Sequence, residues 1–145
     1  YTPKEKNDWA NNLPILRYTD VKMMYAEALN ELGYVADINS EPFKILNAVR
    51  ARAGLDALTP VELYDKDTFR NAIIQERRVE FAFEGLRWCD LIRWGIAVST
   101  MNEHFKHRDE GSGQYTVQDY QLLLPIPFSE MAAYNVNIMW QNEGY

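Results

Sequence analysis

The stretch QERRVEFAFEGLRWCDLIRWG, residues 75–95, decides the fold, because it combines dense charge with apolar residues on nearly every side of a helix. Its glutamates Glu76, Glu80 and Glu84 repeat every four residues and would share one helical stripe. Carboxylates at this spacing repel one another unless cations lie nearby. We therefore predict a scaffold of mutually neutralising ion pairs at these glutamates. The competing interpretation, a pair of catalytic carboxylates, is weaker.

This stretch lies within a predicted pair of helices. Asp65 or Asp67 can cap a helix that continues to Glu84, and Gly85 breaks or bends it before a second helix over residues 86–97. Together these features predict a helical hairpin.

A second predicted hairpin precedes the first. Asp20 can cap a helix that Gly33 ends, and Ser40 can cap another helix that stops before Gly54. The first of these helices carries apolar residues at helical spacing, which predicts its core face: Val21, Met24, Tyr25, Ala28, Leu29 and Leu32. In the second helix, Phe43, Leu46 and Val49 are expected to point inward.

Charge balance links the two hairpins. Arg50 and Arg52, at the end of the second helix, are natural partners for carboxylates of neighbouring helices: Glu27, Glu80 or Glu84. We expect these side chains to be paired and partly buried if the hairpins pack side by side.

The two predicted hairpins cover residues 20–54 and 66–100, which is close to the tetratricopeptide period of about 34 residues. The match is one of length only. Residues 110–114 read as a loop, residues 121–127 as a short extended run, and Ser129 as the cap of a brief helix before an irregular tail. The expected fold is a single all-α domain over residues 1–145, with tetratricopeptide-like helical hairpins and a loop-rich C-terminal section.

Composition excludes several classes of function. Hydrophobic residues make up 47% and charged residues 25%, which is typical of a globular chain. A net charge of −6 repels phosphate backbones, so nucleic acid is not an expected partner. Cys89 is the only cysteine, which excludes an internal disulfide. The chain starts at Tyr1 without an apolar leader, and we expect an excised piece with any export signal or anchor upstream.

No catalytic or metal-binding motif emerges from the residues. His104 and His107 could share a helical face, but no third ligand with suitable spacing follows them. Asp37, Asn39 and Glu41 resemble the start of a calcium loop, yet Pro42 stands where that loop requires glycine. The sequence therefore predicts no catalytic residue, no metal site and no cofactor.

Aromatic side chains in polar, loop-like contexts are the best candidates for ligand binding, namely Trp9, Tyr115 and Tyr120. Sugar rings present apolar C–H faces that stack on aromatic rings, while their hydroxyls seek polar groups. The alternative is that Trp9 and Tyr120 anchor their loops on the helical core.

Five separated blocks of the chain resemble the SusD/RagB family of outer-membrane nutrient-binding lipoproteins. They are RYTDV with YAEALN in residues 17–30, LNAVRARAGL in 46–55, ERRVEF, EGLRW and DLIRWG in 76–95, LPIP in 124–127, and QNEGY in 141–145. Cys89 departs from the bulkier residue that the family more often has between its Trp and Asp.

The resemblance implies the C-terminal region of a longer, non-catalytic lipoprotein on the cell surface of the outer membrane. It also implies membrane attachment only through an upstream lipid anchor, capture of a glycan or other nutrient, and delivery to a TonB-dependent outer-membrane transporter. Because ligand contacts vary within the family, the resemblance assigns no site residue. The alternative function is a helical-repeat protein-docking module without sugar binding, and a glycosidase built on Glu80 and Glu84 ranks third.

Overall fold

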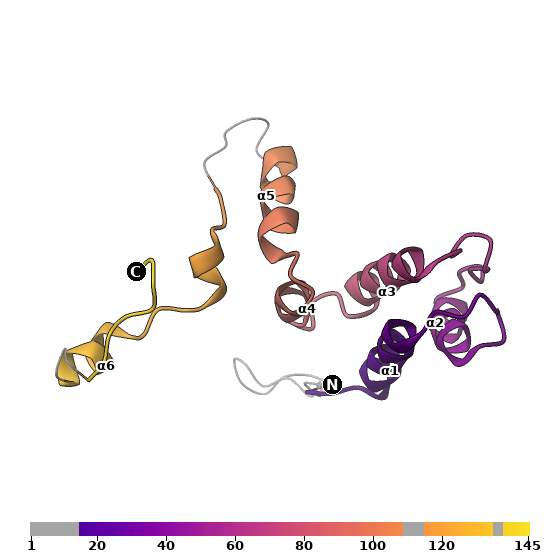
Figure 1. The fold of residues 1–145 in the computed structure, drawn as a ribbon, viewed down its shortest axis with the longest axis horizontal. Helices are drawn as coiled ribbons and strands as arrows, with labels where there is room; N and C mark the ends of the chain where they lie inside the picture. Colours follow the sequence, from indigo (N-terminus) through magenta and orange to yellow (C-terminus); the bar gives the residue numbers. More distant parts are fainter. Residues whose placement is uncertain (1–14, 109–114, 135–137) are drawn as a thin grey trace, which may run out of the picture. The chain divides into compact units, whose positions relative to one another are not determined.

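The computed structural model describes residues 15–108, 115–134 and 138–145, and these residues are helical without a strand (Figure 1). The elements are α1 (Tyr18–Leu32), α2 (Glu41–Arg52), α3 (Lys66–Glu80), α4 (Arg87–Arg93), α5 (Ala97–Arg108), the 3₁₀ helix η1 (Asp119–Leu122) and α6 (Phe128–Ala133). The all-α prediction is confirmed. The chain divides into two compact units, one ending at Gly85 and the other beginning at Leu86. That residues 1–145 form one domain stays a prediction.

The first unit is built on the contact of α1 with both α2 and α3. Phe43 of α2 and Phe69 of α3 lie at its centre, with ring centroids 4.9 Å apart, and Tyr34 contacts both rings from the loop after α1. Phe43, Leu46 and Val49 are buried, as predicted. Their removal from water is the main stabilising contribution to this unit.

The start of α3 follows directly from the sequence. The Asp65 carboxylate accepts a hydrogen bond from the Thr68 backbone N–H at 2.7 Å, and the Thr68 hydroxyl oxygen accepts one from the Asp65 N–H at 3.0 Å. This capping box satisfies donors that the first turn of a helix otherwise leaves unpaired.

Asp20 does not cap α1, contrary to the prediction. The helix begins at Tyr18, with Arg17 as its N-cap residue. The Asp20 side chain instead accepts a hydrogen bond from Arg77 at 2.6 Å, and the two side chains are 9% and 3% exposed. A buried carboxylate requires such a partner, and this requirement outweighs the advantage of a cap.

The predicted core face of α1 is also wrong. Met23, Ala26 and Asn30 are buried, whereas most residues of the predicted face are exposed to solvent: Val21, Met24, Tyr25, Ala28 and Leu32. Both stripes carry apolar residues at helical spacing, so periodicity alone could not choose between them. The structure chooses the stripe that faces α2 and α3.

The chain that follows α3 contains less helix than predicted. α3 ends at Glu80 and not at Glu84, because Phe83 (φ 67°) and Gly85 (φ 80°) adopt left-handed backbone conformations. Gly95 does the same (φ 70°), so the predicted helix over residues 86–97 is divided between α4 and α5. A left-handed residue cannot continue a right-handed helix.

The loops are held by side-chain amides that act as amide clasps, each accepting from the N–H and donating to the C=O of one residue. Asn47 clasps Leu58 in the first unit, at 2.9 and 3.0 Å. In the second unit Asn102 clasps Val117, at 2.7 and 3.0 Å, and Gln141 clasps Ile126, at 2.7 and 2.9 Å. Each clasp thus makes the two hydrogen bonds that paired residues of neighbouring β-strands exchange, although neither segment is a strand.

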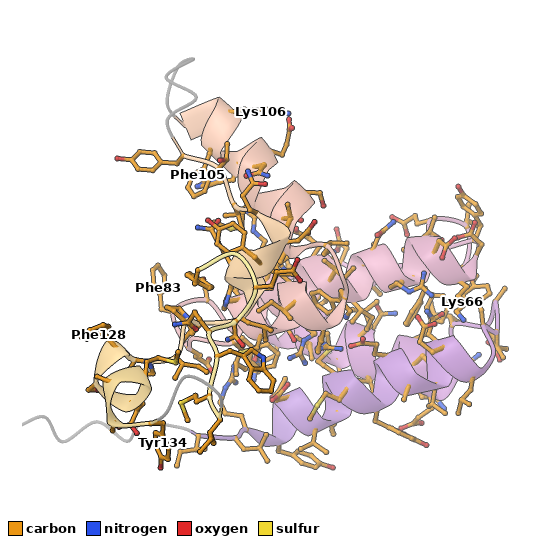
Figure 2. All side chains as sticks on the ribbon, turned by 60° about the vertical axis from the view of Figure 1, so that its left-hand side comes forward. Lys66, Phe83, Phe105, Lys106, Phe128 and Tyr134 are labelled. Carbon is orange, nitrogen blue, oxygen red and sulfur yellow. The ribbon has the colours of Figure 1, made fainter. Side chains whose placement is uncertain are left out.

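The C-terminal section is loop-rich, as predicted, with corrections at its helices. The short helix η1 includes Gln121 and Leu122, which the prediction placed in the extended run. The N-cap of α6 is Pro127 and not Ser129, since the helix already begins at Phe128. Phe128, the first residue of α6, and Tyr134, which follows its last residue, are both exposed (Figure 2).

Candidate functional site

A surface pocket of about 530 Å³ lies in the second unit, between η1 and the end of the chain. Its lining combines an aromatic ring, two carboxylates, an amide, a leucine and a glycine: Tyr120, Asp119, Glu143, Asn142, Leu123 and Gly144. Tyr120, predicted from the sequence as a ligand-binding residue, is 40% exposed there.

Hydrogen bonds to backbone carbonyls hold the far wall of the pocket in place. The Gln141 clasp fixes the tail beside Ile126. Asn142 Nδ2 donates to the Leu124 carbonyl at 2.7 Å, and the Tyr145 hydroxyl donates to the Leu123 carbonyl at 3.0 Å. The polar closing residues of the chain are thus the groups that shape the pocket.

Tyr120 also anchors the tail. Its ring meets that of Tyr145 edge to face, with centroids 5.1 Å apart. Gly144 packs so closely that a Cβ added there would lie 2.7 Å from the Tyr120 Cβ, and its φ of 95° favours glycine. Tyr120 therefore packs on the C-terminal tail, whereas the alternative prediction had its loop anchored on the helical core. Its predicted role in ligand binding stays a prediction.

The pocket offers acceptors for hydroxyl groups. Within the described parts of the chain, the carboxylates of Asp119 and Glu143 have no hydrogen-bond or ion-pair partner. A sugar stacked on Tyr120 could donate its hydroxyls to these oxygens, which accept strongly when ionised. The same charges disfavour an anionic ligand.

The other two predicted ligand residues do not join this pocket. Tyr115 is exposed and packs its ring on Phe105 of α5, with centroids 6.0 Å apart. Trp9 lies outside the described residues. The sequence interpretation does not single out Asp119, Asn142 and Glu143 as pocket residues, although two of them belong to the QNEGY block at the end of the chain.

Glu76, Glu80 and Glu84 form the predicted ion pairs, although Glu84 lies beyond the end of α3. Arg17 bridges Glu80 at 2.9 Å and Glu84 at 2.7 Å. Arg52 pairs with Glu80, as expected. Arg50 pairs with Glu76 at 3.0 Å and not with one of the three carboxylates proposed for it. Glu76 lies one helical turn before Glu80 and so faces an earlier position of α2.

The ion-pair lattice, defined as Arg17, Arg50, Arg52, Glu76, Glu80 and Glu84, pairs each of its carboxylates with an arginine. Burial raises the pKa of Glu80, but hydrogen bonds from Arg52 and Arg17 outweigh it and hold that pKa below its usual value. A general acid would need the opposite shift. The lattice therefore acts as internal scaffolding. The Arg17 guanidinium also packs on the Phe81 ring, 4.8 Å from the ring centroid.

No group of three or more His, Cys, Asp or Glu side chains in the described ranges is arranged to hold a metal ion. None of the described helices is sufficiently long and apolar to cross a membrane.

A first unit of tetratricopeptide-like helices that contains the ion-pair lattice, and a loop-rich second unit that contains the surface pocket, together define the class of protein as an all-α scaffold. Within this class, the model of the SusD family matches residues 2–145. The chain therefore belongs to the SusD family.

Relatives support this assignment. The chain is 34% identical to SusD-like protein P2 of Formosa agariphila over 93% of its own length and 26% of that protein. It is 36% identical to SusD-like protein P25 of the same organism, over 84% of this chain and 22% of that protein. The crystal structure of a SusD homolog from Bacteroides thetaiotaomicron superposes with a TM-score of 0.73 at 32% identity, covering 98% of this chain and 30% of that one.

Proposed function

We propose that the full-length protein captures glycans or other nutrients at the surface of the outer membrane and passes them to a TonB-dependent transporter, without chemistry of its own. The observation that carries this proposal is the match of the SusD family model over residues 2–145. Because the chain spans 26% of SusD-like protein P2, the remaining part of the full-length protein would supply the lipid anchor and further ligand contacts.

We propose that the protein has no catalytic activity of its own, because Glu76, Glu80 and Glu84 are engaged in the ion-pair lattice. A glycosidase needs one carboxylic acid and one carboxylate flanking a bound sugar. Glu76, Glu80 and Glu84 each accept from an arginine instead. Since burial of Glu80 is outweighed by hydrogen bonds from Arg52 and Arg17, which hold its pKa below the usual value, this carboxyl group is not poised to donate a proton.

Within this function, we assign the Tyr120 pocket as one ligand contact. Stacking on the Tyr120 ring and hydrogen bonds to Asp119, Asn142 and Glu143 would together recognise a neutral sugar. Trp9 and Tyr115 stay candidates for further contacts. A shallow pocket of this kind suits binding and release more than retention.

The test uses the full-length protein and a glycan array, followed by calorimetry with the best neutral oligosaccharide. We expect Tyr120→Ala to weaken binding about tenfold, which corresponds to ~1.4 kcal/mol. Tyr64→Ala, which removes an exposed tyrosine from the first unit, should leave the affinity unchanged. Thermal melting of both variants checks that they are folded.

Two results would contradict the proposal. Release of reducing sugar from a bound glycan would favour an enzyme. Absence of binding to every glycan and nutrient tested, together with stable binding of another protein on the helical hairpins, would favour the protein-docking alternative.

A further inference from the structure

Several hydrogen-bond donors at the wall of the Tyr120 pocket are already engaged within the protein. The Asn142 backbone N–H donates to Gln141 Oε1 at 2.9 Å, and Asn142 Nδ2 donates to the Leu124 carbonyl at 2.7 Å. The Leu123 backbone N–H donates to the Tyr120 carbonyl at 3.4 Å. Because these bonds hold the wall together, a ligand meets fewer free donors than the residue types of the lining suggest.

The acceptors of the same pocket remain open. Asp119 and Glu143 are exposed residues of the lining, and neither carboxylate has an ion-pair partner in the part of the chain that the structure describes. An ionised carboxylate accepts hydrogen bonds and donates none. A ligand that fills this pocket should therefore bring more donors than acceptors.

The negative charge of the pocket also lacks a counter-charge in the surrounding sequence. Residues 115–145, which supply the whole lining, contain Asp119, Glu130 and Glu143 but no Lys, Arg or His. A neutral sugar leaves this charge uncompensated. A protonated amine compensates it, and it carries three donors and no acceptor. The Tyr120 ring adds an electron-rich face that suits both a cation and the C–H face of a sugar.

We propose that the Tyr120 pocket prefers an amino sugar, with a free and protonated amine, over a sugar that carries a hydroxyl or an acetamido group at the same carbon. This preference rests on the proposed function, because it names the class of sugar that the pocket takes. The sugar ring stacks on Tyr120, and the ammonium group donates to the carboxylates of Asp119 and Glu143. Charge-assisted hydrogen bonds of this kind are shorter and stronger than those of a neutral hydroxyl.

The test compares oligosaccharides of chitosan, chitin and cellulose, which share the β-1,4 linkage and differ in the group at C2: ammonium, acetamido or hydroxyl. Calorimetry with the full-length protein uses chains of equal length in a mildly acidic buffer of low ionic strength, where the amine is protonated. We expect the chitosan oligosaccharide to bind at least about tenfold more tightly than either neutral one. Added salt should reduce this ratio, because it screens exposed charges.

Variants assign the preference to the pocket. Glu143→Gln should reduce the ratio of the chitosan to the cellulose affinity at least about threefold, and Asp119→Asn should act in the same way. Glu130→Gln is the matched control, since it removes the same charge from an exposed residue of this segment that does not line the pocket. Its ratio should equal that of the unaltered protein. Thermal melting checks that each variant is folded, and the salt series needs no variant.

Three results would overturn the preference. Equal affinities for the three oligosaccharides would do so while leaving the proposed function intact. An equal loss of preference in Glu130→Gln and Glu143→Gln would attribute the attraction to the net charge of the protein and not to the pocket. Absence of binding by all three oligosaccharides would exclude the amino sugar, and the glycan array would decide separately whether the proposed function holds.

Discussion

Arg77 and Asp20 form the most deeply buried ion pair that the structure describes, with a separation of 2.6 Å. Removing one partner leaves an uncompensated charge, which typically costs 3–5 kcal/mol. We therefore expect Arg77→Met to lower the free energy of unfolding by about 3–5 kcal/mol. Urea titration of the full-length protein followed by circular dichroism measures this change.

The adjacent Arg78 provides the control, because it is exposed on the same helix. Arg78→Met should change the free energy of unfolding by no more than about 0.5 kcal/mol. Equal effects at both positions would show that the buried pair contributes no more than a surface charge.

Gly144 is the residue on which the pocket wall depends. Gly144→Ala adds a Cβ in contact with the Tyr120 ring and places a side chain at φ 95°. A non-glycine residue in this region is strained by about 1–2 kcal/mol, so the tail should detach. We expect faster amide exchange at Ile126, whose N–H the Gln141 clasp protects. Gly33→Ala, where nothing lies within 4 Å, should leave that exchange unchanged.

At the scale of elements, the N-termini of α2 and α3 make a matched pair. Asp65 accepts a cap hydrogen bond, whereas the Ser40 side chain makes none and its buried oxygen has no partner among the described residues. Asp65→Ala should therefore cost about 1 kcal/mol, and Ser40→Ala should cost nothing or stabilise slightly. Thermal melting of the two variants compares them. Equal losses would mean that the capping box contributes nothing specific.

The elements also show what the sequence could predict. The hairpin of α1 and α2, the inward residues of α2, the cap of α3 and the pairing of Arg52 with Glu80 all follow from local rules of spacing and charge. The predicted second hairpin does not, because α3 packs on α1 and α2 while α4 belongs to the other compact unit. The buried face of α1 does not, because two apolar stripes compete and only tertiary contact decides. The left-handed backbone conformation of Phe83 could not be predicted either, since phenylalanine rarely adopts a positive φ.

The pocket was only partly predictable for a similar reason. Tyr120 stood out as an aromatic residue in a polar context. Asp119 and Glu143 did not, because they lie 24 residues apart and are brought together by hydrogen bonds from a tail that reads as irregular. Local patterns carry no information about such long-range closure.

At the scale of the whole molecule, the lowered pKa values of two carboxyl groups predict that the folded protein loses stability in acid. Hydrogen bonds from Arg70 and Lys66 lower the pKa of Glu31 to about 2, and the pKa of Glu80 is also lowered. The low folded-state pKa of Glu31 stabilises the protein at pH values above 4.5, which is the ordinary pKa of a glutamate. This contribution disappears as the pH falls towards 2. The melting temperature should therefore drop between those limits.

Glu31→Gln should remove part of this dependence. Since the Glu31 side chain is 40% exposed, solvent screening limits its contribution at neutral pH to about 0.5–1 kcal/mol. Melting curves of the full-length protein at a series of pH values measure the difference. Asp56→Asn, an exposed loop carboxylate, is the control. An unchanged acid profile in Glu31→Gln would show that the pair contributes nothing.

The amide clasps make the loops sensitive to deamidation of their side-chain amides. Asn47, Asn102 and Gln141 each need a donor and an acceptor on the same small group. Spontaneous deamidation leaves the size of that group almost unchanged but replaces the donor with a second, charged oxygen that faces a carbonyl. Deamidation would thus keep the hydrogen bond from the N–H, replace the one to the carbonyl with a repulsion, and weaken the wall of the pocket beside Gln141.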